Sequence, residues 1–224
     1  MSELDLSVTQ HQAAAPSSEG TRPLFYYDLG EPEAYLAAER VMAALPVVPE
    51  WVPVLAAGLP GEAVTGEHDV AAGEEPPGRR AAIEALAARR HVQPLRWPAD
   101  WPGDSRRAMV AATYAKQIGR AVAFSLAAFR QAFAGGRDLA DDDTILIAGA
   151  ACEMHPNAVK KALDRDAIGA ALDAATADAA AAGVRRVPAV RIGDDVYHGD
   201  AGIDAAAAEL TAALTAVRRT TTER

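Results

Sequence analysis

The chain has 224 residues, of which half are apolar and 24% are charged, and its formal net charge is −9. This length allows one domain with a substantial core and a sizeable insertion. The negative charge argues against a nucleic-acid partner, because phosphate binding requires a basic surface. No apolar run reaches the length of a membrane span, so a membrane partner is not expected. Cys152 is the single cysteine, which excludes an intramolecular disulfide.

Residues 1–22 form a polar segment that has neither the basic nor the apolar region of a secretory signal peptide. The composition of this segment predicts a disordered tail. Without a secretion signal in this segment, we expect a cytoplasmic protein.

An aromatic and apolar run over residues 24–29 predicts a buried strand that ends at Gly30. Pro32 is typical of the first turn of a helix, and the carboxylates of Glu31 and Glu33 would complement the positive end of its dipole. A second strand is predicted over residues 47–55, and its prolines place it at an edge of the sheet.

Residues 58–77 are rich in Gly, Pro and Glu and predict a loop, whereas most of the chain from Arg79 to Ala182 has helical signals. The clearest of these is one apolar helix face, spaced by three or four residues: Ile118, Val122, Leu126, Phe129 and Phe133. Strand patterns return at residues 188–192 and 196–198 around a Gly-containing hairpin turn, before a final helix over residues 203–217. The predicted class is therefore α/β.

Four segments resemble one known family: FYYDLGEPEAYLAAERV, EWVPVL, LRWPADWPGDSRRAM and VRRVPAVRIGDDVYHGDAGI. Together they resemble the DsbA-like branch of the thioredoxin superfamily, and within it 2-hydroxychromene-2-carboxylate isomerases and kappa-class glutathione transferases. The resemblance implies a thioredoxin-like fold with an all-helical insertion between its second and third strands. The thioredoxin-like domain would comprise residues 23–66 and 183–219, and the insertion residues 67–182.

The active-site turn of the dithiol members reads Cys-Pro-x-Cys-Tyr, and the matching residues here are Glu31, Pro32, Glu33, Ala34 and Tyr35. Thiol exchange requires a thiolate, so the turn argues against a dithiol oxidoreductase. In the isomerase and transferase branch, a Ser at the first position stabilises the thiolate of glutathione. Glutathione is the cofactor that the resemblance implies, but a carboxylate in that place would repel its thiolate.

Glu31 has three candidate roles. It is a general acid or base for an enolisable substrate, an acceptor for an amine or hydroxyl of a ligand, or a helix-start carboxylate without chemistry. A position at the start of a helix lowers the pKa of a carboxyl group, which disfavours a strong base.

Val187 and Pro188 match the family's Val and cis-Pro, which the resemblance places opposite Glu31 across a cleft. Arg186 precedes them, and it could form a salt bridge with Glu31, hold the carboxylate of a substrate, or lie in solvent.

Four further positions match segments that line the family's cleft. Trp97 and Trp101 would wall an apolar pocket or pack in the core. Asp104 and Ser105 would line the cleft, and either could also cap the following helix.

Two residues near the final helix also match the family's cleft. Asp200 would contact a glutathione-like ligand or cap the final helix. His198 would face the site or serve the fold.

The sequence therefore predicts a non-redox protein that handles a small molecule as an isomerase or a transferase does, with Glu31 in the place of the catalytic Ser or Cys. The alternative is a thioredoxin-fold protein that binds a ligand or partner without catalysis, and a thiol oxidoreductase follows from the family name only. No metal site is predicted, and a homodimer is compatible with the Ala-rich helices.

Overall fold

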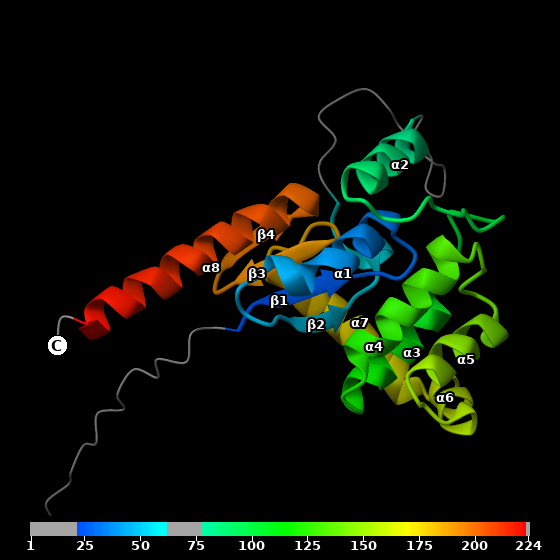
Figure 1. Cartoon of the computed structure of the whole chain (residues 1–224). Helices are drawn as coiled ribbons and strands as arrows, with labels where there is room; N and C mark the ends of the chain where they lie inside the picture. Colours follow the sequence, from blue (N-terminus) through cyan, green and yellow to red (C-terminus); the bar gives the residue numbers. More distant parts are fainter. Residues whose placement is uncertain (1–21, 62–77, 223–224) are drawn as a thin grey trace, which may run out of the picture.

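The computed structural model of the chain describes residues 22–61 and 78–222. Figure 1 shows their arrangement along the sequence. The predicted tail, up to residue 21, and the predicted domain boundary at residues 66 and 67 lie outside the described residues. The elements are, in chain order, β1 (Leu24–Tyr27), α1 (Pro32–Ala44), β2 (Glu50–Pro53), η1 (Ala56–Gly58), α2 (Arg79–Arg89), α3 (Arg106–Gln117), α4 (Ala121–Phe129), η2 (Arg130–Ala134), α5 (Asp142–Ala151), α6 (Pro156–Leu163), α7 (Asp166–Ala181), β3 (Ala189–Ile192), β4 (Asp195–His198) and α8 (Gly199–Thr222).

The four strands form one sheet in the order β2-β1-β3-β4. β1 pairs with β2 in parallel, as expected for a strand–helix–strand unit, and β3 pairs with β1 and β4 in antiparallel fashion. β2 and β3 lie on either side of β1 in the sheet, but along the chain the helices α2 to α7 separate them. The chain therefore returns to β1 only after residue 188. This order confirms the predicted α/β class.

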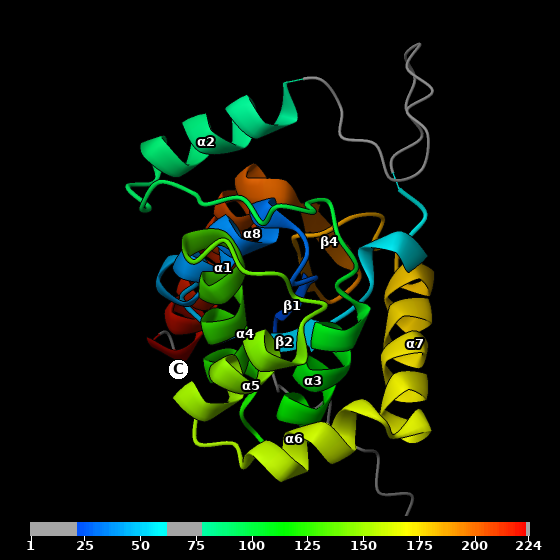
Figure 2. The same cartoon turned by 90° about the vertical axis from the view of Figure 1, so that its right-hand side faces the viewer.

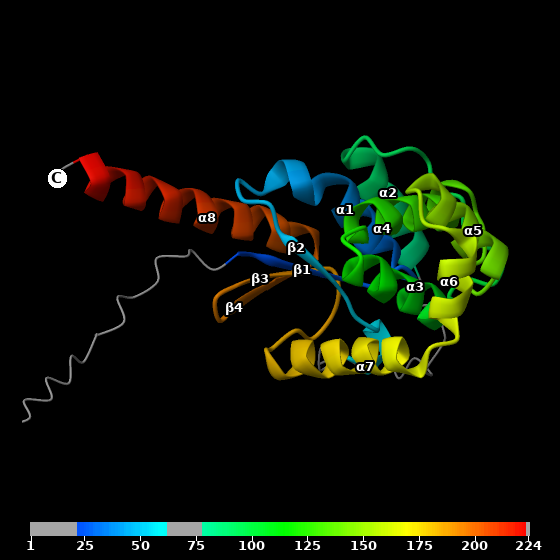
Figure 3. The ribbon, with the colours of Figure 1, turned by 90° about the horizontal axis from the view of Figure 1, so that it is seen from below.

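Alternate side chains of the strands face the two sides of the sheet. Phe25, Tyr27 and Trp51 point into the larger core, which contains residues of α1, α3 and α4. Tyr26 and Val52 point into a smaller core that Ala179 of α7 helps to form. Figure 3 shows the sheet between α7 on one side and α1 with the other helices on the opposite side. α7 therefore covers a face of the sheet, although the sequence grouped it with the insertion.

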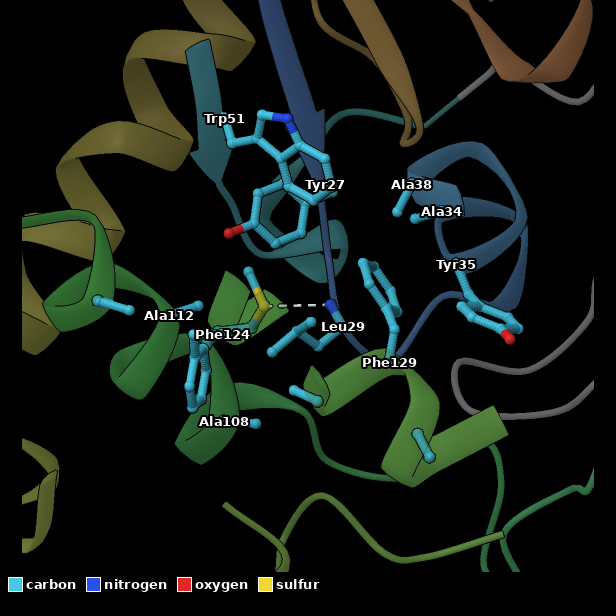
Figure 4. Packing of buried hydrophobic residues seen from close by; sticks show 14 of the residues in the cluster. Tyr27, Leu29, Ala34, Tyr35, Ala38, Trp51, Ala108, Ala112, Phe124 and Phe129 are labelled. Carbon is cyan, nitrogen blue, oxygen red and sulfur yellow. Dashed lines mark hydrogen bonds between the residues drawn. The ribbon is translucent and has the colours of Figure 1, made fainter. Parts of the chain in front are cut away.

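The centre of the larger core is aromatic (Figure 4). The ring centroids of Tyr27 and Trp51 lie 5.4 Å apart, and those of Tyr27 and Phe129 lie 5.9 Å apart. The buried Tyr27 hydroxyl shares a hydrogen bond of 2.6 Å with the hydroxyl of Ser125, so its polar end is satisfied.

The predicted helix face that begins at Ile118 is wrong at its start. α3 ends at Gln117, and Ile118 is 45% exposed, because Gly119 adopts a φ of +73° and turns the chain before α4 begins. Phe129 and Phe133 are buried as expected, and Phe133 lies in the π-helical turn η2 that continues α4. The predicted face therefore lies on α4 and η2, and its first residue, Ile118, belongs to the turn between α3 and α4.

The helices α2 and α8 lie at the margin of the molecule. Figure 2 shows α2 above α1 and the first turns of α8, and Figure 1 shows the last turns of α8 projecting away from the sheet. Within the described residues, no helix combines the length and the hydropathy needed to cross a bilayer.

The packing of α8 on the hairpin depends on the missing side chain of Gly202. A Cβ at this position would lie 2.7 Å from the carbonyl carbon of Tyr197, which is backbone and cannot move aside. We expect Gly202→Ala to lower the free energy of unfolding by about 1–3 kcal/mol. Gly169 in α7 is the matched control, since its nearest neighbour would be 3.9 Å away. Gly169→Ala should raise the free energy by about 0.5–1 kcal/mol through helix propensity. Urea denaturation measures both, and equal effects of the two substitutions would contradict the packing argument.

Candidate active site

A buried carboxylate, that of Asp28, lies directly behind the turn that carries Glu31. Asp28 is 3% exposed and follows the last residue of β1. Its Oδ1 accepts the N–H of Gly30 at 2.9 Å, its Oδ2 accepts the N–H of Ala56 at 2.8 Å, and the Ser105 hydroxyl donates a further bond. Burial raises the pKa of Asp28, and these three bonds oppose the rise. The carboxylate therefore joins the turns after β1 and β2 to the start of α3.

The turn itself leaves no room for a side chain at Gly30. A Cβ there would lie 2.9 Å from the Cβ of Ser105, so Gly is required by close approach. The indole N–H of Trp101 donates to the carbonyl oxygen of Gly30 at 3.2 Å. Trp101 thus covers the turn from the side of the segment that precedes α3.

Glu31 occupies the N-cap position of α1 without capping it, and Pro32 is the first helical residue, as predicted. The Glu31 carboxylate instead forms an ion pair with Arg79 of α2. The same guanidinium binds Glu33, with nitrogen–oxygen distances of 3.0 and 2.8 Å. One arginine therefore bridges the two carboxylates on either side of Pro32.

The electrostatic setting of Glu31 differs from the expectation for a helix start. Its side chain is 28% exposed, and burial raises its pKa. Arg79 lowers the pKa, but Glu33 and Asp28 raise it further. The predicted lowering is wrong, because the loss of hydration and the neighbouring carboxylates outweigh the one cation.

Trp101 forms part of the wall of a small cavity beside Gly30, Trp97 packs against Trp101, and arginines of α2 cover both rings. Their ring centroids lie 4.6 Å apart. The Arg80 guanidinium is 5.1 Å from each ring centroid and donates to the Trp101 carbonyl at 3.0 Å, while Arg79 is 5.2 Å from the Trp101 ring. These are cation–π distances, so both tryptophans pack against α2, and Trp101 also lines the cavity.

Asp104 and Ser105 lie beside this wall. Asp104 accepts the N–H of Arg106 at 2.8 Å and so binds the first turn of α3, whereas the side chain of Ser105 makes no cap. Both residues line a cavity of about 20 Å³ together with Gly30 and Trp101. That volume holds little more than a water molecule. The cleft beside the turn is therefore filled by protein side chains.

Val187 and Pro188 lie at the same end of the sheet as the Asp28–Glu31 turn. The antiparallel register pairs Tyr26 with Ala189, so the two residues before Ala189 continue alongside the end of β1. Both are buried, and the peptide bond between them is cis. The sheet therefore brings these two segments, about 160 residues apart in the chain, to the same end of the sheet.

Arg186 is not the partner that the sequence suggested for Glu31. The ion pair of Glu31 is with Arg79, and the guanidinium of Arg186 lies near Gly199, where an added Cβ would be 3.3 Å from its Nη1. The reason is geometric. α2 passes over the start of α1, so Arg79 of α2 reaches Glu31, whereas the loop before Pro188 does not supply the cation.

The remaining predicted residues serve other contacts. His198 accepts the backbone N–H of Arg185 at 3.0 Å on Nε2, so it braces the loop that leads to Pro188. The ring of Tyr35 packs in the core, 5.8 Å from that of Phe133, and Tyr35 also lines a pocket of about 440 Å³ whose lining does not include Glu31.

The predicted cap at Asp200 is wrong. α8 begins at Gly199, one residue before Asp200, and the Asp200 carboxylate binds Arg40 at 2.9 Å and Arg90 at 3.1 Å. It thereby ties the start of α8 to α1 and to the end of α2. Sequence reasoning missed both arginines, as well as Asp28 and Arg79, because each partner is distant in the chain.

Cys152 lies outside the candidate site. It ends α5, it is buried, and its sulfur bonds the carbonyl oxygens of Ala148 and Gly149. Burial raises the pKa of its thiol, which opposes formation of a thiolate. Across residues 22–61 and 78–222, no cluster of three or more His, Cys, Asp or Glu side chains could hold a metal ion.

We expect Arg79→Met to raise the pKa of Glu31 further, because the substitution removes the cation that opposes the effect of burial. A carboxyl group whose folded-state pKa lies above its unfolded value lowers stability as pH rises through the interval between them. The variant should therefore lose about 1 kcal/mol at neutral pH and less in acid, where Glu31 is protonated. Carbon-detected NMR titration of Glu31 and urea denaturation at two pH values measure these effects. Arg89→Met, at an exposed position of the same helix, is the control, and an unchanged Glu31 pKa in Arg79→Met would refute the pairing.

Comparison with known proteins identifies the fold of this site. No curated protein matches the sequence. A solved 2-hydroxychromene-2-carboxylate isomerase superposes with a TM-score of 0.69 at 19% identity, over 90% of this chain and 98% of the other. A probable DsbA oxidoreductase from Streptomyces coelicolor gives a TM-score of 0.67 at 20% identity, over 87% and 90%. The glutathione-bound cytosolic disulfide reductase DsbM from Pseudomonas aeruginosa gives 0.59 at 19%, over 88% and 99%. At these identities the likeness establishes a thioredoxin-like fold. Residues 72–211 match the family of DSBA-like thioredoxin domains. The chain therefore belongs to the DsbA-like thioredoxin family.

Proposed function

We propose that the chain is a non-redox member of its family that binds a small organic molecule beside Glu31, and that Glu31 transfers a proton there. The observation that carries the proposal is a partly buried carboxyl group with a raised pKa at the first position of the active-site turn. A carboxyl group whose pKa moves toward neutrality is suited to accept and return a proton.

The absence of sulfur from the turn supports a non-redox function. Glu31 and Ala34 stand where the dithiol members of the family have cysteines. Cys152 is buried, and the pKa of its thiol is raised. A thiol oxidoreductase, like the DsbA oxidoreductase and the disulfide reductase among the structural neighbours, would need an exposed thiolate that this turn does not provide.

The charges around the turn favour a ligand other than a thiolate. Glu31 and Glu33 share one bridging arginine, Arg79, and Asp28 lies behind the turn, so these three carboxylates outnumber the cation that pairs with them. A glutathione thiolate would be repelled there. A carboxylate-bearing aromatic substrate would compete with Glu31 for Arg79 and stack on Trp101. Glu31, released from Arg79, would then accept and return the proton.

Binding without catalysis is the second candidate, and a specific observation favours it. Arg79 already forms an ion pair with the Glu31 carboxylate, and the cavity beside the turn has a volume of about 20 Å³. Any ligand of aromatic size would have to displace Trp101 or the arginines of α2. A protein that recognises a ligand or partner by that displacement would need no proton transfer.

The proposal includes a cytoplasmic location and leaves room for a homodimer. The Ala-rich helices support the homodimer. Cell fractionation and light scattering test them.

The first experiment combines binding and turnover with 2-hydroxychromene-2-carboxylate as the probe. We expect the probe to raise the thermal midpoint of the protein and of Glu31→Gln, because the amide leaves the cleft intact. The rate of isomerisation, followed by absorbance, should fall by about a hundredfold or more in Glu31→Gln. Glu33→Gln, which alters the neighbouring carboxylate, is the control and should retain turnover. Binding without turnover in the unmodified chain would favour the second candidate, and the absence of any midpoint shift would overturn the proposed ligand.

The second experiment tests the exclusion of thiol chemistry. The unmodified chain should not reduce insulin disulfides above background, because no thiolate lies at the turn. Glu31→Cys combined with Ala34→Cys restores the Cys-Pro-x-Cys pattern and should confer activity, whereas Ala34→Cys alone should not. Clear insulin reduction by the unmodified chain would refute the proposal.

A further inference from the structure

A second pocket lies at the end of the sheet opposite to the candidate active site. β1 runs from Leu24 at this end to Tyr27 at the end that carries the Asp28 turn. The pocket has a volume of about 520 Å³, within the range of small-molecule sites. Its walls come from Arg22 ahead of β1, from the start of β2 and the two residues before it, from the end of α3 and from the start of α4. It is therefore distinct from the site of Glu31.

The rim of this pocket is basic in a chain whose net charge is −9. Arg22, Lys116 and Arg120 line it, and Glu50 is the acidic residue among the lining side chains. Lys116 binds Glu50 at 2.8 Å and lowers its pKa, so this pair stays ionised and leaves two positive charges in excess. Arg120 also lies 3.5 Å from Glu153, an 84% exposed side chain that does not line the pocket. The local charge therefore favours an anion.

The helix α4 begins in the wall of the pocket. Arg120 is its N-cap residue and provides no side-chain cap. The first intrahelical bond runs from the N–H of Phe124 to the carbonyl of Arg120. The N–H groups of Ala121, Val122 and Ala123, all lining residues, precede that bond and so have no acceptor within the helix. They supply donors and a positive dipole end beside the cations.

An independent observation is the indole of Trp51, another lining residue. Trp51 is 2% exposed, and within the described parts of the chain its Nε1 is the one buried side-chain nitrogen or oxygen without a hydrogen-bond partner. Figure 4 shows this nitrogen on the side of the ring away from the Tyr27 hydroxyl. A buried donor without an acceptor lowers stability, and an oxygen of a ligand would relieve that cost.

The rest of the wall is apolar. Val48, which is 56% exposed, lies with Pro49, Trp51 and Val122 around the pocket. We propose that this pocket binds a small arenecarboxylate, whose flat apolar body lies on these side chains and whose carboxylate meets Arg120 and the start of α4. This site is independent of the function proposed for Glu31.

NMR of the full chain with 2-naphthoate as the probe tests the proposal. The chain has three tryptophans, so its three indole N–H resonances can be assigned with Trp97→Phe and Trp101→Phe. We expect a saturable shift of the Trp51 resonance at submillimolar to millimolar probe, with the other two resonances unchanged. A shift of the Trp97 or Trp101 resonance alone would place the probe in the Glu31 cleft and overturn the proposal, as would no saturable shift at all.

Two exposed substitutions sharpen the test without disturbing the core. Arg120→Glu should weaken the affinity about tenfold by reversing the charge at the start of α4, and Val48→Asp should weaken it through the apolar wall. Arg219→Glu, the same charge reversal in the last turn of α8, is the matched control and should leave the affinity unchanged. Equal affinities of Arg120→Glu and Arg219→Glu would overturn the assignment of the carboxylate.

Discussion

The candidate active site depends on the buried carboxylate of Asp28. It accepts backbone N–H groups of Gly30 and Ala56 and a hydroxyl hydrogen bond from Ser105, so three segments from different parts of the chain meet on one side chain. Each of these donors would be left without its partner if the carboxylate were absent, at a cost of about 1–3 kcal/mol for each buried group. The turn that presents Glu31 is thus fixed from behind by Asp28, and from above by Trp101 and Arg79.

Charge, more than apolar contact, positions the helix that closes this site. α2 buries only Ile83 and Ala87 among its eleven residues. Its arginines make the remaining attachments: Arg79 binds the two carboxylates beside Pro32, and Arg90, which follows the helix, binds Asp200 at the start of α8. Partly exposed ion pairs of this kind weaken as salt rises. The cover of the cleft is therefore the part of the fold that ionic conditions would loosen first.

The sequence predicted those features that depend on neighbours in the chain. Aromatic and apolar runs located the first two strands, Pro32 located the start of α1, and the Gly-containing hairpin located β3 and β4. It offered Arg186 as one possible partner of Glu31 and did not find Arg79, because Arg79 is 48 residues away and no local pattern links the two. The pKa of Glu31 was wrong for a related reason: burial and the approach of Asp28 arise only when the chain folds, whereas the effect of a helix dipole can be read from sequence alone.

Replacing sulfur by a carboxylate at the active-site turn changes which ligands the fold can accept. A thiolate site needs a surplus of positive charge to keep its anion, as at an uncapped helix start. Here Glu31 and Glu33 supply the negative charge themselves, and Asp28 behind the turn adds to it, so Arg79 is drawn onto the protein's own carboxylates. A ligand that binds must either compete for that arginine as an anion or replace it as a cation or hydrogen-bond donor. At the far end of β1 the setting is different, because Arg22 and Arg120 line a pocket there beside the start of α4, which has no side-chain cap. The end of β1 that carries the turn therefore has mainly acidic side chains, whereas basic side chains line the pocket at its other end.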